Sequence, residues 1–406
     1  MILTYPDAAA LVLQHAQQLA AAKRPSEQLP LQQALGRVLS TPVSADRDLP
    51  PFHRSTRDGY AVQAAAISTG NWLPVVGTLR AGEPASANLQ PSTVLEIMTG
   101  APVPQGADAV VMLEHVESTD NHIRLAPGRK VTAGSHIVPV GSEARAGDTV
   151  LPAGTRLAAN HIAALASVGA AQVEVFVRPR VAILATGDEL VDINACPQPH
   201  QIRNSNSASL AALVSLAGGE PILLGIARDN LDDLRALLST AQPSSDLLLL
   251  SGGVSAGKYD LVEQALAERG AAFHFTGVRI QPGKPTVFGE LPADARPLPF
   301  FGLPGNPVST MVTFLLFAAP KLRALAGETA LGPQFAQATL AEPEPPTDLT
   351  RFLPAHLDAG WDHATVRRIP WQGSGDLAAT ARSNCFVVLP PDTAIEANAT
   401  VRILLP

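Results

Sequence analysis

The chain has 406 residues, of which 46% are hydrophobic and 16% charged, so it can bury several cores and is not a mainly disordered protein. Its 36 acidic and 29 basic residues give a net charge of −7, which disfavours a broad nucleic-acid-binding face but leaves room for one small anion in a local pocket. The length suggests two to four domains of about 150 residues each.

Several protein classes are disfavoured by the distribution of apolar residues and cysteines. The longest apolar run, 308–319, is shorter than the roughly twenty residues of a membrane span. The N-terminus has no positively charged region typical of a signal peptide. Cys196 and Cys385 cannot build a disulfide framework, and the sequence has no CxxC motif or Cys/His cluster, so we expect both to be inert rather than nucleophilic. We therefore expect a cytoplasmic protein with no membrane or nucleic-acid partner.

The first part of the chain predicts a helical region that is interrupted by a β-rich module. Residues 1–45 are predicted to be helical from the spacing of their leucines, namely Leu11, Leu13, Leu19, Leu29, Leu31 and Leu35. Short apolar segments separated by turn residues then follow over 46–140, and a helical pattern returns near residue 157. We assign 1–45 and 141–172 to a helical N-terminal and linker region, and 46–140 to an inserted β-rich domain.

The rest of the chain predicts an α/β domain over 173–328 and a small β domain over 329–406. Strand and helix patterns alternate in the former, and the short apolar runs at 181–185 and 247–250 are typical of strands buried on both faces. This alternation predicts a doubly wound, mostly parallel sheet. The last region contains short strand patterns after a linker rich in proline and glutamate. The fold class is therefore multidomain α/β plus β.

Four loops of the α/β domain are candidates for one binding site. They are Thr186–Glu189, Ser251–Asp260, Pro282–Pro285 and Gly302–Ser309. Ligands of open α/β sheets bind at the carboxyl ends of the strands, where glycines let backbone N–H groups approach an oxyanion. One glycine loop alone is more often an ordinary turn, but four in one sheet favour a ligand that contains phosphate.

The loop at 251–260 comes close to a Walker A sequence without matching it. Gly252, Gly257 and Lys258 have the required spacing. Tyr259 occupies the position of the Mg²⁺-binding Ser or Thr, so we reject that motif. Lys284, between Gly283 and Pro285, can act as a fixed positive charge for an oxyanion, although a solvated loop lysine is the commoner case.

Carboxylates in loops that follow predicted strands suggest Mg²⁺, which prefers oxygen ligands and shares them with phosphates. They are Asp188, Glu189, Asp229 and Asp260. Asp188 could equally cap a helix, and Asp229 could form a turn. In the β-rich module, the polar segments 49–62 and 98–110 are consistent with binding at an interface or, equally well, with two tight turns.

The combined motifs resemble the molybdopterin molybdenumtransferase family, whose eukaryotic relatives include the C-terminal part of gephyrin. The segments that carry this resemblance are 49–62, Met98–Pro104, Gly106–Val110, Thr186–Leu190, Asn204–Asn206, Ser251–Ser255, Pro282–Pro285 and Gly302–Ser309. Each segment is a weak signal alone. Their order and number extend the resemblance over nearly the whole chain.

The resemblance implies a fold, an activity and an assembly. The expected fold has a helical segment, an inserted β domain, a molybdopterin-binding α/β domain and a C-terminal β barrel. The expected enzyme is a transferase that cleaves adenylylated molybdopterin with Mg²⁺, releases AMP and inserts molybdate into the dithiolene. The expected assembly is an elongated homodimer with the active site between the α/β domain of one subunit and the inserted domain of the other. Other cofactor-biosynthesis proteins and acceptor enzymes are further expected partners.

The resemblance also implies site residues. The expected catalytic residues are Asp58, Thr99, Glu189, Asp260 and Lys284. The expected cofactor-binding residues are Asn204, Ser251, Gly252, Gly253, Pro285, Gly305, Asn306, Ser309 and Arg351. Lys284 and Ser309 are similar to the family's molybdate contacts. The expected metal ligands are Asp260, from the resemblance, and Asp229, from its place after a strand.

The chain departs from the family pattern at four positions. Arg57 replaces a common Met, Gln281 a Lys, Val138 an Arg and Glu143 an Asp.

The two alternative functions are a non-catalytic scaffold and an adenylyltransferase. A non-catalytic scaffold would not need Asp58, Glu189, Asp260 and Lys284 together. An adenylyltransferase that makes the intermediate would resemble only the middle domain. An assay of AMP release distinguishes the enzyme from the scaffold.

Overall fold

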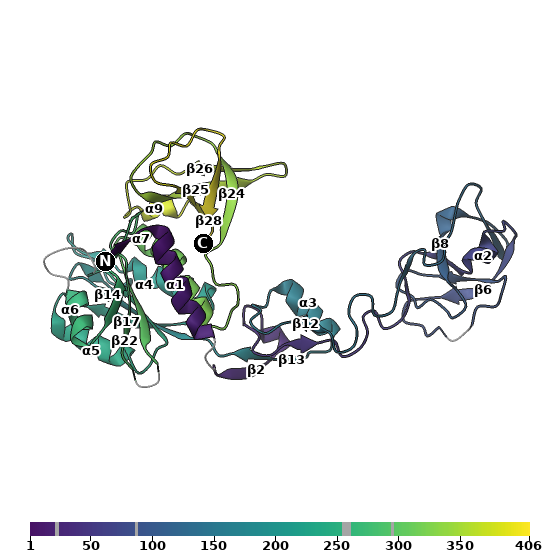
Figure 1. Ribbon diagram of the computed structural model, residues 1–406, viewed down its shortest axis with the longest axis horizontal. Coiled ribbons are helices and arrows are strands. Elements are labelled where there is room, and N and C mark those ends of the chain that lie inside the picture. Colours follow the sequence, from purple (N-terminus) through teal and green to yellow (C-terminus); the bar gives the residue numbers. More distant parts are fainter. Residues whose placement is uncertain (21–23, 86–87, 254–260, 294–295) are drawn as a thin grey trace.

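The computed structural model describes residues 1–20, 24–85, 88–253, 261–293 and 296–406, so the expected ligand Asp260 lies outside the described residues. The molecule is elongated (Figure 1). An α/β domain with the C-terminal β domain beside it forms one end, and a six-stranded sheet from the inserted region forms the other. A narrow segment that contains β2, β13 and α3 connects the two ends (Figure 1).

The prediction of helix over residues 1–45 is wrong beyond residue 20. The helix α1 covers Tyr5–Ala20, and the chain then forms β2 (Ser26–Pro30), the 3₁₀ turn η1 (Leu31–Gln33) and β3 (Val43–Ser44). Pro25 and Pro30 each lack a backbone N–H and disfavour a helix through this segment. Leu29 and Leu31 instead pack against the strand that carries Val173.

Three antiparallel ladders join the outgoing and returning chain of the connecting segment. The pairs are β2 with β13 (Gln172–Phe176), β3 with β12 (Thr149–Leu151) and β4 (Arg54–Ser55) with β11 (Ile137–Val138). The short helix α3 (Ala159–Ser167) is the helical part of the returning chain. Both arms of the connection are therefore mostly extended rather than helical.

The inserted region forms the β-rich module that was predicted. Its sheet has the order β8-β5-β7-β6-β10-β9. The strands are β5 (Gly59–Val62), β6 (Leu73–Leu79), β7 (Val94–Ile97), β8 (Ala109–Met112), β9 (Val116–Thr119) and β10 (His122–Leu125), with the short helices α2 (Ala64–Ile67) and η2 (Leu113–His115). A Cβ on Gly59 would lie 1.9 Å from the Val111 carbonyl oxygen, so only glycine fits where β5 meets β8.

The α/β domain has a six-stranded sheet in the order β17-β14-β18-β23-β22-β19. The first four strands are parallel, whereas β22 runs antiparallel to both of its neighbours. The strands are β14 (Arg180–Thr186), β17 (Glu220–Ala227), β18 (Leu247–Ser251), β19 (Ala272–Phe275), β22 (Val287–Leu291) and β23 (Leu298–Leu303). Short pairs flank this sheet: β1 (Ile2–Leu3) with β20 (Gly277–Val278), and β15 (Leu190–Val191) with β16 (Ile202–Arg203).

Helices cover both faces of this sheet, as the alternation predicted. One face packs on α1, α4 (Ser205–Leu216) and the continuous helix made of α7 (Pro307–Thr313), η3 (Phe314–Ala318) and α8 (Ala319–Leu325). The other face packs on α5 (Leu231–Ala241) and α6 (Leu261–Glu268). In β14, Val181 and Ile183 point into the first core, and Ala182 and Leu184 into the second. Two buried faces explain why this strand is a continuous apolar run.

One helix of the described chain is long and apolar enough to cross a membrane. It is Pro307–Leu325, and 89% of its most apolar window is buried inside the protein. Its residues Val308, Val312 and Phe317 belong to the main core of the α/β domain. Packing against the sheet therefore accounts for its apolar composition.

The C-terminal region is a closed five-stranded barrel. Its strands are β24 (Phe335–Leu340), β25 (Thr350–Ala359), β26 (Ala364–Arg368), β27 (Cys385–Leu389) and β28 (Thr400–Leu404). The ring runs β25-β26-β24-β28-β27 and closes because β27 also pairs with β25. β21 (Ile280–Gln281) pairs in parallel with the start of β25. The helical turn α9 (Leu377–Thr380) lies between β26 and β27 in the sequence. The strand β24 was not predicted, since its alternation of small and polar residues is a weak local signal.

Candidate functional site

A cleft of about 1050 Å³ lies at the carboxyl ends of the four parallel strands. The described residues that line it are Thr186, Gly187, Glu189, Leu190, Ile202, Arg203, Asn204, Ser205, Asn206, Asp229, Ser251, Gly252, Gly253, Leu261, Pro285, Pro304, Gly305, Asn306, Pro307, Gly375 and Leu377. This is the position at which open α/β sheets bind ligands. Gly375 and Leu377 come from the barrel region, so the cleft is bounded by two parts of the chain.

The structure brings the four expected loops together around this cleft. Each loop contributes at least one described lining residue, including Glu189, Ser251, Pro285 and Gly305. The start of α4, with Asn204 at its N-cap, forms a further part of the wall. The positive end of the α4 dipole therefore faces the cleft, which favours an anionic group there.

The Asn206 side chain holds three elements of the site in place. Its amide nitrogen donates to the Ser251 hydroxyl at 2.8 Å and to the Gly305 carbonyl at 2.7 Å. The first turn of α4 is thereby fixed to the loops that follow β18 and β23. Nearby, the Asn204 side chain accepts from the Ser207 backbone N–H at 3.1 Å and caps the helix.

Two polar atoms in the cleft wall are buried and have no hydrogen-bond partner among the described residues. They are Oγ1 of Thr186 and Oδ1 of Asn206. Such orphaned atoms cost free energy unless a ligand or water satisfies them. Gly252 has a φ of +91°, and a Cβ there would lie 2.6 Å from the Thr186 carbonyl oxygen. Glycine thus allows the backbone after β18 to pass close to Thr186 at the floor of the site.

Carboxylates occupy one side of the cleft. Glu189 and Asp229 line it. Asp188 and Asp229 exchange two hydrogen bonds, each from the backbone N–H of one residue to the carboxylate of the other. The Asp229 N–H donates to Asp188 Oδ1 at 3.2 Å, and the Asp188 N–H donates to Asp229 Oδ2 at 3.4 Å. Both carboxyl groups are exposed to solvent, so they are available to an incoming cation. Arg203, also in the wall, is the basic group among the described lining residues.

These carboxylates fit Mg²⁺ in their chemistry. Within the described residues they do not by themselves form a three-ligand cluster. Mg²⁺ commonly binds through one or two carboxylates and completes its shell with water and substrate phosphates. Asp229 and Glu189 are the described groups suited to this role, and Asp260 cannot be placed.

Three of the expected binding residues do not line the cleft. Lys284 is exposed next to the lining residue Pro285, so it stands at the rim. Ser309 is buried within α7. Arg351, in β25, faces Glu344 at 3.4 Å and donates to the Pro345 carbonyl at 2.6 Å. The Arg351 guanidinium thus has protein partners inside the barrel.

Asp58 immediately precedes β5 and Thr99 follows β7 in the inserted domain. The sheet of that domain lies at the opposite end of the molecule from the α/β domain (Figure 1). The Asp58 Oδ1 atom accepts the Thr99 backbone N–H at 2.7 Å and the Thr99 hydroxyl at 3.0 Å. The backbone and then the side-chain hydrogen bond from Thr99 lower the pKa of Asp58 below its ordinary value. This pair therefore presents an ionised carboxylate at the surface of the inserted domain.

Some lining residues were missed by the sequence reasoning. Thr186, Asn206 and Gly375 line the cleft, and the sequence patterns do not single them out as site residues. Thr186 has a recognisable signal, since it is the last residue of a strand buried on both faces. The bridging role of Asn206 has none, because its two partners lie 45 and 99 residues away in sequence.

Family models match three successive parts of the chain. Residues 3–169 match the MoeA N-terminal region (domains I and II), 182–324 a probable molybdopterin binding domain, and 337–405 the MoeA C-terminal region (domain IV). These matches cover most of the sequence, and the second contains most of the described lining residues of the cleft.

Curated relatives and solved structures agree with these models. A molybdopterin molybdenumtransferase of Bacillus subtilis is 34% identical over 94% of this chain and 90% of its own length. One of Haemophilus influenzae is 33% identical over 93% of both chains. The crystal structure of a molybdopterin biosynthesis MoeA protein from Pyrococcus horikoshii has a TM-score of 0.81 at 28% identity and covers 100% of both chains.

Proposed function

The chain belongs to the molybdopterin molybdenumtransferase family, and on that premise we propose that it transfers molybdenum to molybdopterin in the cleft of its α/β domain. The substrate we propose is adenylylated molybdopterin, from which AMP is released as molybdate enters the dithiolene. The observation that carries this proposal is the convergence of the four loops on one cleft whose wall holds two unsatisfied polar atoms.

The described residues suit a ligand with several phosphate charges. The N-terminal turn of α4 supplies backbone N–H groups and a positive partial charge. Oδ1 of Asn206 can accept a hydrogen bond from a donor group of the ligand. Ser251 is held by Asn206, so its hydroxyl has a fixed direction. Binding in this fixed frame would position the phosphates with little loss of side-chain entropy.

Mg²⁺ fits the acidic side of the cleft, where Asp229 and Glu189 would hold it; Asp260, the ligand that the resemblance implies, lies outside the described residues. When bound, the ion would neutralise charge on the phosphate oxygens. Lys284, exposed at the rim beside Pro285, would attract the molybdate dianion as a point charge. Ser309 is buried in the first turn of α7, two residues after the lining residue Pro307, and we propose it as a second molybdate contact.

A second subunit would complete the site. The ionised Asp58 carboxylate, held by Thr99, belongs to the inserted domain, which lies at the opposite end of the molecule from the α/β domain (Figure 1). We propose that in a homodimer the inserted domain of one subunit brings Asp58 and Thr99 to the α/β cleft of the other. The elongated shape supports this arrangement, because it carries the inserted sheet well beyond its own α/β domain (Figure 1).

The test is release of AMP from adenylylated molybdopterin, followed with and without Mg²⁺ and molybdate. We expect release to require both ions. Lys284→Ala is expected to lower molybdate-dependent turnover by at least about tenfold while AMP binding is kept, since only the fixed charge is lost. Lys130→Ala, which removes an exposed lysine of the inserted domain, is the control. Absence of AMP release under all conditions would favour a non-catalytic scaffold, and an unchanged Lys284→Ala enzyme would refute the role of that lysine.

A further inference from the structure

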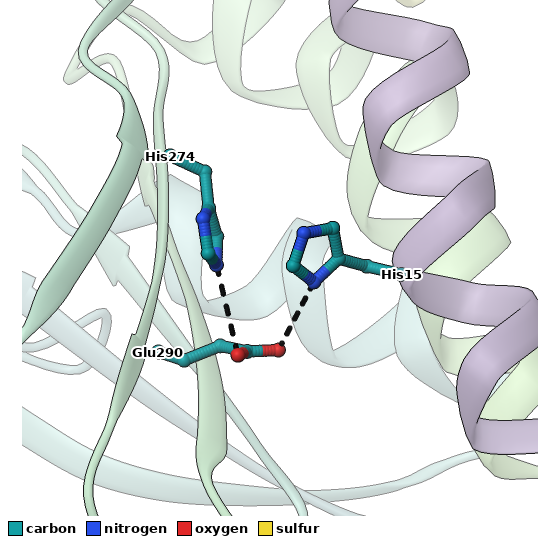
Figure 2. A group of neighbouring side chains, drawn as sticks. All are labelled: His15, His274 and Glu290. Atoms are coloured by element: carbon teal, nitrogen blue, oxygen red, sulfur yellow. Dashed lines mark ion pairs between the residues drawn. The ribbon is translucent and has the colours of Figure 1, made fainter.

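Two histidines and a glutamate meet at the edge of the main sheet, away from the proposed cleft. His15 comes from α1, His274 from β19 and Glu290 from β22. Their potential ligand atoms all lie within 4.8 Å of one another. Figure 2 shows the two imidazole rings and the carboxylate turned toward a common point. Of the described residues, this is the group of three with metal-binding geometry.

The nitrogen–oxygen distances in this group are too long for good hydrogen bonds. His15 Nδ1 lies 3.5 Å from Glu290 Oε1, and His274 Nε2 lies 3.6 Å from Glu290 Oε2. Normal N–H···O bonds are about 2.9–3.0 Å long. Accordingly, His274 Nε2 is buried and has no hydrogen-bond partner within the part of the chain that the structure describes. Each imidazole therefore faces the carboxylate without being satisfied by it.

An ion can lie between the three groups when one Glu290 oxygen faces both nitrogens, which now lie 3.5 Å from Oε1 and 3.6 Å from Oε2. Zinc–nitrogen bonds of about 2.0–2.1 Å in a tetrahedron place neighbouring ligand atoms about 3.3–3.4 Å apart. Two histidines and one carboxylate are also a known donor set for Zn²⁺, with a fourth position left for water. We propose that His15, His274 and Glu290 form a Zn²⁺ site that fastens α1 to the outer strands of the sheet.

Access and packing are compatible with this site. The three side chains are 19–23% exposed, so an ion can enter from solvent without unfolding. The two imidazoles are in tilted contact, with ring centroids 4.2 Å apart and ring planes at 47°, and each also contacts Phe288. These aromatic contacts restrict ring rotation, so little entropy remains to be lost when the donors bind an ion.

Lys321 competes with the ion for the same carboxylate. Its buried ammonium lies 3.6 Å from Glu290 Oε1 and donates to the His15 carbonyl oxygen at 3.2 Å. A cation bound beside it would experience charge repulsion. The zinc affinity is therefore expected to be lower than in a site without a lysine, and removal of the ammonium should raise it.

The experiment is a zinc titration of the full chain, prepared without a histidine tag and stripped with a chelator, followed by calorimetry. We expect saturable binding of one Zn²⁺ ion per chain. His15→Phe and His274→Phe keep an aromatic ring at each position. Each should weaken zinc binding by at least about tenfold, because loss of even a residue that only orients a metal ligand costs about 10–100-fold in affinity. His363→Phe, at an exposed histidine in the turn between β25 and β26, is the matched control and should bind as the parent does.

Further arms keep the test decisive if a histidine variant folds poorly. Lys321→Met should bind zinc several-fold more tightly, and zinc should raise the thermal midpoint of the parent but not of the His15→Phe/His274→Phe double variant. No saturable zinc binding, or binding that both histidine variants retain, would overturn the proposal. Equal affinity in Lys321→Met and the parent would also contradict it. None of these outcomes depends on the proposed transferase activity, because the cluster lies outside the cleft lining.

Discussion

Asn206 and Ser251 are joined by a hydrogen bond of 2.8 Å between the amide Nδ2 and the hydroxyl oxygen, although they are 45 residues apart in the sequence. The second amide hydrogen of Asn206 is given to the Gly305 carbonyl. Because the remaining Oδ1 atom is buried and unsatisfied, one side chain both builds the cleft and offers it an acceptor. This relationship leads to the first prediction.

Asn206→Asp is expected to weaken AMP binding by about tenfold or more, because it places a negative charge in a site for phosphate. Asn206→Ala is expected to lower the free energy of unfolding by about 1–3 kcal/mol, since Ser251 and Gly305 lose their donor. Calorimetry with AMP and chemical denaturation measure the two effects. Asn71→Asp adds the same charge at an exposed position of the inserted domain and should leave AMP binding unchanged. Equal AMP affinity in Asn206→Asp would exclude a phosphate site at this wall.

Subunit complementation tests whether Asp58 and Lys284 act in one shared site. Asp58→Asn and Lys284→Ala are each expected to be nearly inactive alone. In random mixed dimers, half of the molecules carry one intact site of two, so about a quarter of the parental activity should return. The measurement is turnover of co-expressed, separately tagged subunits.

The control for complementation pairs two defects in the same domain. Glu189→Gln and Lys284→Ala both affect the α/β cleft, so their mixed dimers contain no intact site and should stay inactive. Recovery in this control, or none in the Asp58→Asn mixture, would show that the site is not shared in the proposed way.

Arg156 connects the extended segment to the α/β domain. Its guanidinium pairs with Glu328 and donates to the carbonyl oxygens of Gly36 and Ala217, each at 2.8 Å. Glu328 is buried, so Arg156→Met is expected to lower the free energy of unfolding by about 2–4 kcal/mol, a value reduced for the partial exposure of the arginine. Thermal and denaturant unfolding give the value. Arg235→Met removes only exposed ion pairs and should change stability much less.

The two cysteines are expected to differ in reactivity. Burial raises the pKa of the Cys385 thiol to about 11, whereas Cys196 is exposed. The thiolate is the reactive form, so at pH 8 a thiol reagent should modify Cys196 and leave Cys385 intact until the protein unfolds. Counting modified thiols by mass spectrometry, with Cys196→Ser as the control, checks this. Rapid modification of Cys385 in the native Cys196→Ser protein would contradict the buried placement.

Most elements could be predicted where a local pattern has one structural solution. The apolar run 181–185 is a strand because it is too short for a buried helix and has no polar face, and β14 covers it. The loop after it reaches the cleft because parallel strands end at one edge of a sheet. In contrast, the leucine spacing over 26–45 fits a helix almost as well as a strand. Pairing with β13, far along the chain, decided in favour of β2.

The sequence by itself therefore determined the doubly wound α/β domain, the inserted β module and the loops that converge on the cleft, because these depend on hydrophobic periodicity and glycine placement between neighbouring residues. Only the tertiary structure decided which distant side chains meet. Arg351 pairs with Glu344 and the Pro345 carbonyl, in the segment between β24 and β25, and does not line the cleft. Lys321 reaches the carbonyl of His15, 306 residues away, because α8 packs against α1. Such contacts follow from packing and strand register, which no local pattern records.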